Sequence, residues 1–267
     1  MFHYAKMSFS IGKAVDFFSG KCYDSKTCRR LWTLCVFFKK GRERVNSNIT
    51  VICGHYGCGK TNLALNLAVE AAAKGRRSVI VDMDIVNPYF RSSEYGPFLE
   101  KHGVQLIAPV FANTTLDTPV LPPEIYSIFN MEDTDVFIDA GGDDVGATAL
   151  GRLSRELTQA GYEMIYVVNR YRILSTKPEE TLPLLREIEG ASHLRATAVV
   201  NNSHLGVDTT LQTVRDAVDF AEESARLCGL PLLYSTIPDF AAGEEIPEGF
   251  KVVRRYVHFV WEDEADY

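Results

Sequence analysis

The apolar residues after position 44 form short continuous runs, and longer stretches with helical spacing separate the runs. Each run is rich in β-branched residues and bounded by turn-forming residues, which is typical of buried strands. The predicted strands lie at 49–53, 78–82, 104–108, 136–139, 164–168, 196–200 and 232–235. In the intervening stretches apolar residues recur every three or four positions, which predicts helices. These helices lie near 61–74, 147–160, 179–188 and 209–228.

Continuous apolar runs indicate strands that are buried on both faces, because a half-exposed strand would alternate apolar and polar residues. Strands that alternate with helices form a mainly parallel sheet with helices on each side. We therefore expect one doubly wound α/β domain over residues 45–267, with its ligand beyond the carboxyl ends of the strands.

A glycine-rich loop follows the first predicted strand, in CGHYGCGKTNLALNLA at residues 53–68. Gly54, Gly59, Lys60 and Thr61 satisfy the spacing G-x-x-x-x-G-K-[ST], in which backbone amides and a helix N-terminus cradle phosphate groups. In such a loop the lysine reaches the β- and γ-phosphates, and the threonine hydroxyl binds Mg²⁺. The sequence therefore predicts a P-loop NTPase.

Three neighbours of these residues are also candidate nucleotide contacts, namely Gly57, Cys58 and Asn62. Cys58 adjoins Lys60 and the start of a helix, and both features lower the pKa of a thiol. A redox role for Cys58 is therefore a second hypothesis at this position.

Two aspartates follow the second predicted strand, in VDMDIVNPYFR. Asp84 is our candidate for the acid that orients the attacking water and supports Mg²⁺. Asp82 either faces the same metal or caps the turn, as an aspartate after a strand commonly does. Arg91 either meets a phosphate or pairs with Glu94.

The fourth predicted strand ends in IDAGGDDVGATALGR. Asp139 and Gly142 have the D-x-x-G spacing of nucleotide switches, in which the acid supports Mg²⁺ and the glycine amide senses the γ-phosphate. A plain Asp-Gly turn is the alternative. Asp143, Asp144 and Gly146 indicate a segment that moves when the nucleotide changes.

The choice of base depends on Asn201 and Asn202, which follow the sixth predicted strand in AVVNNSHLG. GTPases of this architecture carry N/T-K-x-D there, and this chain has no such Lys-x-Asp. An asparagine amide can pair with the donor and acceptor edge of adenine, so ATP is favoured over GTP. Turn capping is the alternative role for either asparagine. The STIPDF loop after the seventh strand is a further candidate for contacting the base.

Charge is unevenly distributed along the chain. Residues 1–44 carry a net charge of +7, and residues 45–267 carry −14. An acidic domain argues against duplex DNA or RNA as its main partner, because binding a phosphate backbone needs a basic face. The six cysteines show no CxxC spacing, which favours a reduced, cytoplasmic protein. No apolar run is long enough for a transmembrane segment.

Residues 1–44 show no clean periodicity and leave two interpretations open. They form either a basic extension that contacts a membrane surface or a partner, or a segment that is absent from the mature protein. In the second case Val45 is the start, and residues 39–44 reflect a translated ribosome-binding site.

The order of these motifs resembles the CobQ/CobB/MinD/ParA group of P-loop ATPases, which includes the nitrogenase iron protein. The resemblance covers about residues 45–240, and VDMDIVNPYFRS and IDAGGDDVGATALGR are most similar to a bacterial subfamily of that group. It implies phosphate binding by Gly57, Gly59, Lys60 and Thr61, a water-orienting acid at Asp84, and a metal or switch role for Asp139.

The chain departs from that group at His55 and Tyr56. The ParA and MinD loop reads G-K-G-G-x-G-K-[ST], and its first lysine reaches the nucleotide of a dimer partner. Neutral imidazole at His55 cannot supply the permanent positive charge of that lysine. The loop therefore gives no argument for a dimer that forms around the nucleotide, and the sequence leaves a homodimer open. Gly146 occupies the position that resembles the cluster cysteine of the iron protein, so no bridging iron–sulfur cluster is expected.

Taken together, these features predict a Mg²⁺-dependent ATPase that acts as a nucleotide-driven switch for a protein partner. The expected catalytic residues are Lys60, Asp84 and Asp139, and the expected metal ligands are Thr61, Asp84 and Asp139. One alternative is a small-molecule kinase or ATP-dependent synthetase of the CobQ/CobB type, with Arg91 and Asp117 in its substrate pocket. Another is an ATP-binding scaffold that does not hydrolyse ATP.

Overall fold

The computed structural model describes residues 48–84, 92–108, 123–142 and 144–258. The chain divides into two units, Met1–Glu43 and Arg44–Tyr267, and every described residue lies in the second unit. The expectations for residues 1–44, Arg91, Asp117 and Asp143 therefore fall outside the described residues, as does the side chain of Asp144.

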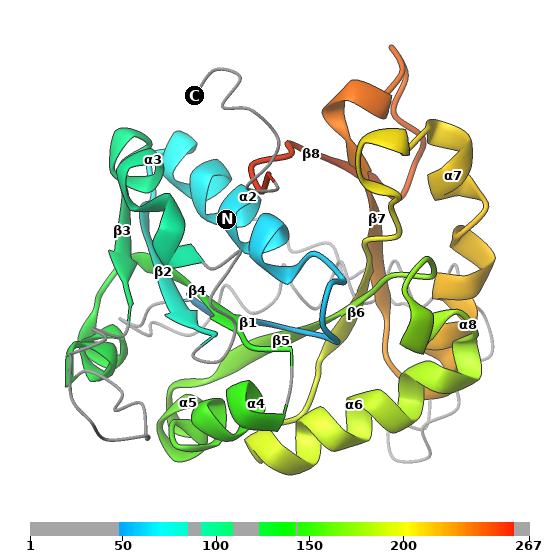
Figure 1. Ribbon diagram of the computed structural model, residues 1–267. Coiled ribbons are helices and arrows are strands. Elements are labelled where there is room, and N and C mark those ends of the chain that lie inside the picture. The colour runs from blue at the N-terminus through cyan, green and yellow to red at the C-terminus, as the bar shows by residue number, and fades with distance from the viewer. Residues whose placement is uncertain (1–47, 85–91, 109–122, 143, 259–267) are drawn as a thin grey trace, which may run out of the picture. The chain divides into compact units, whose positions relative to one another are not determined.

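Eight described strands form one sheet in the order β3-β2-β4-β1-β5-β6-β7-β8, and every neighbouring pair is parallel (Figure 1). Their bounds are Asn48–Cys53 (β1), Arg77–Met83 (β2), Val104–Ile107 (β3), Thr134–Ala140 (β4), Tyr162–Val168 (β5), Ala198–Asn201 (β6), Leu232–Pro238 (β7) and Phe250–Val253 (β8). The chain moves from β1 toward one edge and later returns to build the other, so the carboxyl end of β1 is a switch point in the strand order. The predicted doubly wound α/β fold is confirmed.

Helices lie on both sides of this sheet. Their bounds are Lys60–Ala73 (α2), Gly96–Lys101 (α3), Asp144–Gly151 (α4), Ser154–Ala160 (α5), Pro178–Ser192 (α6), Leu211–Arg215 (α7) and Val218–Cys228 (α8). In Figure 1, α2 and α3 lie on one face, and α4, α5, α6 and α8 lie on the other.

Alternate residues of each central strand enter different hydrophobic clusters, because successive side chains of a strand point to opposite faces. In β1, Ile52 packs with Leu63 and the other apolar residues of α2, whereas Val51 packs with Leu150 and residues of α5, α6 and α8. Both faces of the sheet are therefore buried, which accounts for the continuous apolar runs in the sequence.

Apart from the short helix α3, which the sequence did not predict, the structure differs from the predicted elements at three places. The helix expected at 147–160 is two helices, α4 and α5, and the helix expected at 209–228 is α7 and α8. Gly151, at the first break, lies so close to α6 that a Cβ there would be 2.8 Å from the carbonyl oxygen of Ala191. The third difference is β8, which the pattern did not predict, because its four residues include a charged Lys251 that pairs with Glu70 of α2.

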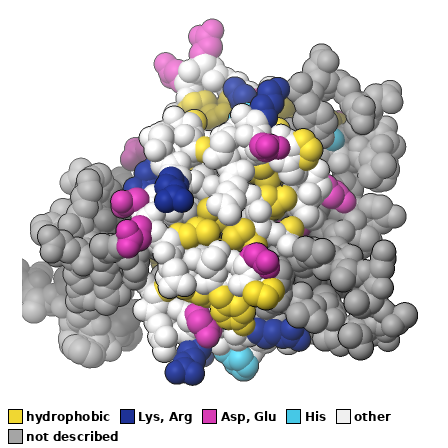
Figure 2. Space-filling view, turned by 90° about the vertical axis from the view of Figure 1, so that its left-hand side faces the viewer, with side chains coloured by type: hydrophobic (Ala, Val, Ile, Leu, Met, Phe, Trp, Pro, Cys, Tyr) yellow, Lys and Arg dark blue, Asp and Glu magenta, His cyan; other side chains and the backbone are white. Residues whose placement is uncertain are grey.

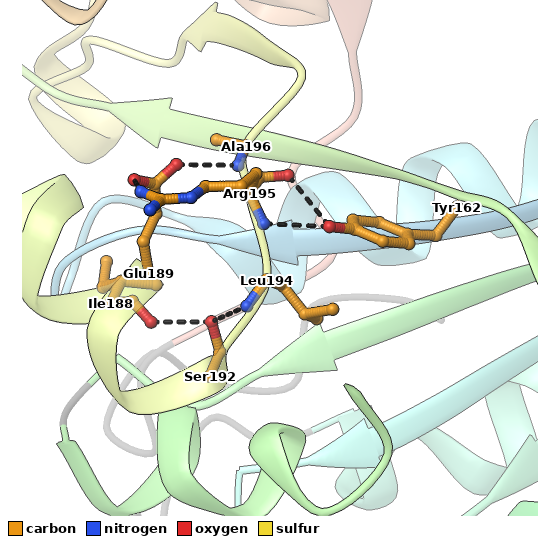
Figure 3. Close-up of polar contacts among 7 residues, drawn as sticks. All are labelled: Tyr162, Ile188, Glu189, Ser192, Leu194, Arg195 and Ala196. Atoms are coloured by element: carbon orange, nitrogen blue, oxygen red, sulfur yellow. Dashed lines mark hydrogen bonds and ion pairs between the residues drawn. The ribbon is translucent and has the colours of Figure 1, made fainter. Parts of the chain in front are cut away.

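Side chains satisfy the backbone of the turn between α6 and β6 (Figure 3). The amide of Arg195 donates to the Tyr162 hydroxyl at 2.9 Å, and the amide of Ala196 donates to the Glu189 carboxylate at 3.0 Å. The Ser192 hydroxyl donates to the carbonyl of Ile188 at 2.7 Å. These bonds fix the start of β6 and hence the position of the residues at its carboxyl end.

Figure 2 shows the face of the described unit at the β3 edge of the sheet, where hydrophobic side chains gather centrally. Lys and Arg side chains lie among Asp and Glu side chains around them, so the described part of this face has no broad basic surface. Within the described ranges, no helix combines the length and the hydrophobicity that a membrane span requires.

Candidate functional site

The glycine-rich loop connects β1 to α2 at the switch point of the sheet. Gly54, Gly57 and Gly59 have φ angles of 152°, 75° and 87°, which L side chains rarely adopt. A Cβ on Gly54 would lie 2.5 Å from the carbonyl oxygen of Val167, so the loop packs tightly against the end of β5. These glycines are therefore required by the path of the backbone.

The loop ends at the N-terminus of α2, which is open to an anion. Gly59 is the N-cap in a left-handed conformation, and no side chain of the described residues caps the helix. The first intrahelical bond runs from the amide of Leu63 to the carbonyl of Gly59. The amides of the first turn therefore lack acceptors within the helix, and they carry the positive end of its dipole.

Lys60 is buried, with 6% of its surface exposed. Its Nζ donates to the carbonyl of His55 at 3.3 Å, which folds the side chain back over the loop. A Cβ on Gly142 would lie 2.7 Å from this Nζ and 2.8 Å from the backbone nitrogen of Tyr56. The structure thus brings the predicted switch glycine into contact with the predicted phosphate loop.

Three aspartates lie at the carboxyl ends of β2 and β4. Asp82 pairs with Asp139 across the two strands, and each is 1% exposed. Asp82 accepts from the amides of Asp84 and Ser93, both at 2.9 Å, so it has the turn-capping role that the sequence left open. Asp84 is 8% exposed and lines the pocket beside Lys60 and Thr61.

Asp139 is the most perturbed of these acids. Burial, and secondly the charge of Asp82, raises the pKa of Asp139 to about 7, and Ser92, Lys60 and Thr61 oppose that shift. The Ser92 hydroxyl donates to its Oδ2 at 2.6 Å, whereas Oδ1 is buried with no hydrogen-bond partner among the described residues.

These features fit a divalent cation, because Mg²⁺ prefers oxygen ligands and often keeps most of its water. A cation beside Asp139 would give the buried Oδ1 a partner and offset its repulsion with Asp82. No cluster of three or more His, Cys, Asp or Glu residues of the described chain could hold a metal by itself. Nucleotide phosphates and water would therefore supply the remaining ligands.

A pocket of about 250 Å³ extends from the phosphate loop toward the carboxyl ends of β6 and β7. Its far end is lined by Asn202, Thr236, Pro238, Phe240, Val253 and Val257. Apolar side chains with a few polar groups suit a nucleoside. The STIPDF stretch contributes three of these residues, but it is not the loop that the sequence predicted, because Thr236 and Pro238 lie within β7. The contribution of Val253 and Val257 was not foreseen.

The two candidate base-binding asparagines have different surroundings. Asn201 is fully buried and bonds to Ser203 and Ser235, so its side chain is engaged within the fold. Asn202 lines the pocket. Its amide donates to the carbonyl of Cys58 at 2.7 Å, and its Oδ1 accepts from the Thr236 hydroxyl at 2.5 Å.

Asn62 lines the pocket but turns its side chain to the segment after β8. Its Nδ2 donates to the carbonyl of Arg254 at 3.0 Å, and its Oδ1 accepts from the amide of Tyr256 at 2.8 Å. Asn66, one turn along α2, exchanges two more bonds with the backbone of Arg254. The first two turns of α2 therefore hold the chain segment that closes the far end of the pocket.

Arg172 and His204 line the pocket and were not predicted from the sequence. Nδ1 of His204 accepts from the amide of Gly206 at 3.2 Å, so a neutral ring carries its proton on Nε2, which lies near Gly59. Burial, together with the charges of Arg172 and Arg255, lowers the pKa of His204 to about 4. Neither residue belongs to a motif, and only their positions after β5 and β6 could have drawn attention to them.

The lowered thiol pKa expected for Cys58 is wrong. Cys58 is 2% exposed, and burial raises the pKa of its thiol despite the nearby charge of Lys60. Tyr56, by contrast, is 58% exposed at the mouth of the pocket. His55 turns its Nδ1 to within 3.3 Å of the carbonyl oxygen of Tyr56.

This arrangement of sheet, loop and helix is the P-loop NTPase fold. The structure is similar to FtsY from Mycoplasma mycoides, with a TM-score of 0.52, 15% identity, and coverage of 74% of this chain and 62% of FtsY. It is also similar to the cell division protein FtsY from Thermotoga maritima, with a TM-score of 0.51, 16% identity, and coverage of 72% of this chain and 62% of that FtsY. A third structure, FtsY from Elizabethkingia anophelis in complex with GDP, has a TM-score of 0.48, 15% identity, and coverage of 74% and 59%.

At these identities the likeness to the first two structures shows a shared fold alone. The chain spans less than two thirds of the length of these FtsY proteins. No protein-family model matches the chain, and neither does any curated protein.

Proposed function

We propose that this protein is a Mg²⁺-dependent ATPase of the CobQ/CobB/MinD/ParA group that acts as a nucleotide-driven switch for a protein partner. The observation that carries the proposal is the contact of Gly142 with Lys60 and Tyr56. It joins the end of β4 to the phosphate loop, so a γ-phosphate beside Lys60 would also meet the Gly142 backbone.

Each predicted group has a role in this proposal. The loop amides and Lys60 bind the phosphates, and Asp84 orients the attacking water. Mg²⁺ would be held by Thr61, Asp139 and Asp84, and when bound it would neutralise charge on the phosphates. Ser92 holds Oδ2 of Asp139, which leaves Oδ1 available on the other side of the carboxyl group.

The preference for ATP rests on the carboxyl end of β6. Asn201, Asn202, Ser203 and His204 follow one another there, and none of them is a carboxylate that could accept from the N1 and amino group of guanine. A contact between the base and Asn202 is part of the proposal. Its amide has two hydrogens, and the bond to Cys58 uses one of them.

The proposed setting is a cytoplasmic protein with an unidentified protein partner. A homodimer that forms around the nucleotide is one form of that partnership. The switch would act through Gly142 and the segment that follows it, since this is where the phosphate loop meets the end of β4.

The proposal is tested by measuring nucleotide binding and phosphate release with Mg²⁺ present. The full chain should bind ATP more tightly than GTP and hydrolyse it slowly. Lys60→Ala should lose binding, whereas Lys74→Ala, at the exposed end of α2, should not. If the wild type bound neither nucleotide at millimolar Mg²⁺, the proposal would be lost. Tight binding without phosphate release would indicate the non-hydrolysing scaffold.

One observation favours the small-molecule kinase or synthetase as a second candidate. A cavity of about 910 Å³ lies against the nucleotide pocket and shares Phe240, Arg254, Arg255 and His258 with it. Aromatic residues such as Tyr95, Phe98 and Tyr256 line this cavity together with Lys101 and His102. ATP turnover that one small acid accelerates many-fold, without any protein partner, would favour this candidate over the switch.

A further inference from the structure

We infer that Arg172 is a phosphate ligand, which the connection after β5 supplies to the loop of the same chain. The inference rests on the proposed nucleotide binding and adds to it a residue that belongs to no recognised motif.

The backbone around Arg172 is held in place by a short turn. The amide of Arg172 donates to the carbonyl of Asn169 at 3.3 Å, and the amide of Ser175 donates to the carbonyl of Arg172 at 2.9 Å. The Ser175 hydroxyl closes the turn by donating to the Asn169 carbonyl at 2.7 Å. Arg172 therefore projects from a fixed point next to the carboxyl end of β5.

The side chain of Arg172 lies against the middle of the phosphate loop. A Cβ on Gly57 would be 3.4 Å from Nε of Arg172, 3.6 Å from Cζ and 3.7 Å from Cδ. Arg172 lines the same pocket as Gly57, Gly59 and Lys60. Its charge also lowers the pKa of the neighbouring His204. Arg172 thus lies against the loop and lines the pocket that the phosphates would occupy.

Arg172 is half-buried, and the Nε of its guanidinium lacks a partner among the described residues. Its Nε is buried with no hydrogen-bond acceptor in the described part of the chain, and no described carboxylate forms an ion pair with it. Leaving a charged donor unsatisfied is costly, and a phosphate oxygen would offset that cost with charge-assisted hydrogen bonds. Planar guanidinium matches phosphate oxygens better than an ammonium does.

A guanidinium could instead stack on the base, and this role makes a different prediction. Stacking would contribute equally to a nucleoside and a nucleotide, whereas a phosphate ligand contributes only where phosphate is present. Adenosine and inorganic tripolyphosphate distinguish the stacking role from the phosphate-binding role, because adenosine is the nucleoside part of ATP and tripolyphosphate is its phosphate part.

The test uses calorimetric titration of the full chain with ATP, tripolyphosphate and adenosine at fixed salt and Mg²⁺. Arg172→Ala should weaken ATP and tripolyphosphate binding by roughly tenfold to a hundredfold and leave adenosine unchanged. Arg172→Lys should recover part of the loss. Arg170→Ala is the matched control in the same connection, because Arg170 is exposed and bonds to the carbonyl of Asp216.

Circular dichroism and thermal melting establish that each variant is folded, and the Arg172→Lys variant retains the charge if Arg172→Ala fails to fold. If Arg172→Ala bound ATP within twofold of the wild type, the inference would be overturned while the proposed function stood. An equal loss of adenosine and ATP affinity would also overturn it, in favour of stacking. If the wild type bound neither ATP nor tripolyphosphate, both the inference about Arg172 and the proposed function would be overturned.

Discussion

The side-chain amide of Asn202 donates a hydrogen bond to the carbonyl of Cys58 at 2.7 Å, across 144 positions of the chain. The same amide group would lie 2.2 Å from a Cβ on Gly59, so the end of β6 and the phosphate loop are in direct contact. Through its Oδ1, Asn202 also accepts from Thr236 at the end of β7. One side chain therefore links the loop to two strands of the pocket.

Asn202→Asp should destabilise the protein by about 1–3 kcal/mol, because a carboxylate cannot donate to the Cys58 carbonyl. Urea denaturation without nucleotide measures this change. Asn130→Asp, at an exposed position, makes the same chemical change on the surface and serves as the control. Equal stability of the two variants would show that the bond to Cys58 contributes nothing.

Gly142→Ala should weaken binding of the triphosphate more than binding of the diphosphate. The added Cβ would lie 2.8 Å from the backbone nitrogen and 2.9 Å from the Cα of Tyr56, so the loop or the end of β4 must shift. Such overpacking costs about 1–3 kcal/mol. The affinities for ATP and ADP are measured side by side.

Gly190→Ala in α6 is the matched control, because a Cβ there meets nothing within 4 Å. In a helix this change is neutral or stabilises by about 0.5–1 kcal/mol. Unchanged ATP affinity in the Gly142→Ala variant would argue against contact between Gly142 and the γ-phosphate.

Acid should destabilise the folded protein through His204. Its pKa falls from 6.5 to about 4 on folding, so the unfolded chain binds more protons between these values. The stability that this residue contributes is present above pH 6.5 and is lost as the pH falls toward 4, by at most about 3 kcal/mol. Chemical denaturation across this range gives the slope.

His204→Gln should flatten that acid dependence, because glutamine does not titrate. His193→Asn, at the exposed C-cap of α6, controls for the loss of a histidine and keeps a residue that tolerates the left-handed conformation. If the wild type and His204→Gln lost stability equally in acid, the acid dependence would arise from a group other than His204.

The thiols of Cys53 and Cys58 should resist alkylation in the folded protein at pH 8. Both are buried, and burial raises the pKa of each thiol, so little thiolate forms. Peptide-resolved mass spectrometry after brief iodoacetamide treatment measures the modification, with the urea-denatured protein as the positive control. Rapid native alkylation of Cys58 would restore the redox hypothesis for that residue.

Asn66→Ala should loosen the segment after β8 without unfolding α2. Two bonds to the backbone of Arg254 are lost, while Asn62 retains its own. Hydrogen exchange should become faster in peptides covering residues 254–257 and stay slow in α2. Lys74→Ala removes an exposed ion pair with Glu70 of the same helix. This variant should change hydrogen exchange neither in residues 254–257 nor in α2.

The sequence predicted much of the fold, because its signals are local. Apolar runs located seven of the eight described strands, and the G-x-x-x-x-G-K-T pattern located the loop between β1 and α2. The sequence also predicted the aspartates at the carboxyl ends of β2 and β4. Parallel strands bring these ends to one edge of the sheet. In the structure Asp84 lines the pocket, whereas Asp82 and Asp139 are buried beside it.

The remaining parts of the site depend on contacts between distant segments, which no local pattern records. Arg172 lies against Gly57 because β5 neighbours β1, and the sequence around it shows only an arginine in a loop. Asn62 looked like a nucleotide contact because it follows Thr61, yet its side chain bonds to the backbone of Tyr256. Strand order and side-chain direction, which decide both cases, emerge only from the assembled sheet.

The bond between Asn62 and Tyr256 spans 194 positions, and it has a consequence for biosynthesis. A ribosome adds about 5–20 residues per second, so roughly 10–40 s separate the two residues during translation. Throughout that interval the phosphate loop has been made, but the segment that closes the far end of the pocket has not. A nascent chain would therefore offer a nucleotide only an unfinished site, and capture of the ligand would follow translation of β8 and the segment after it.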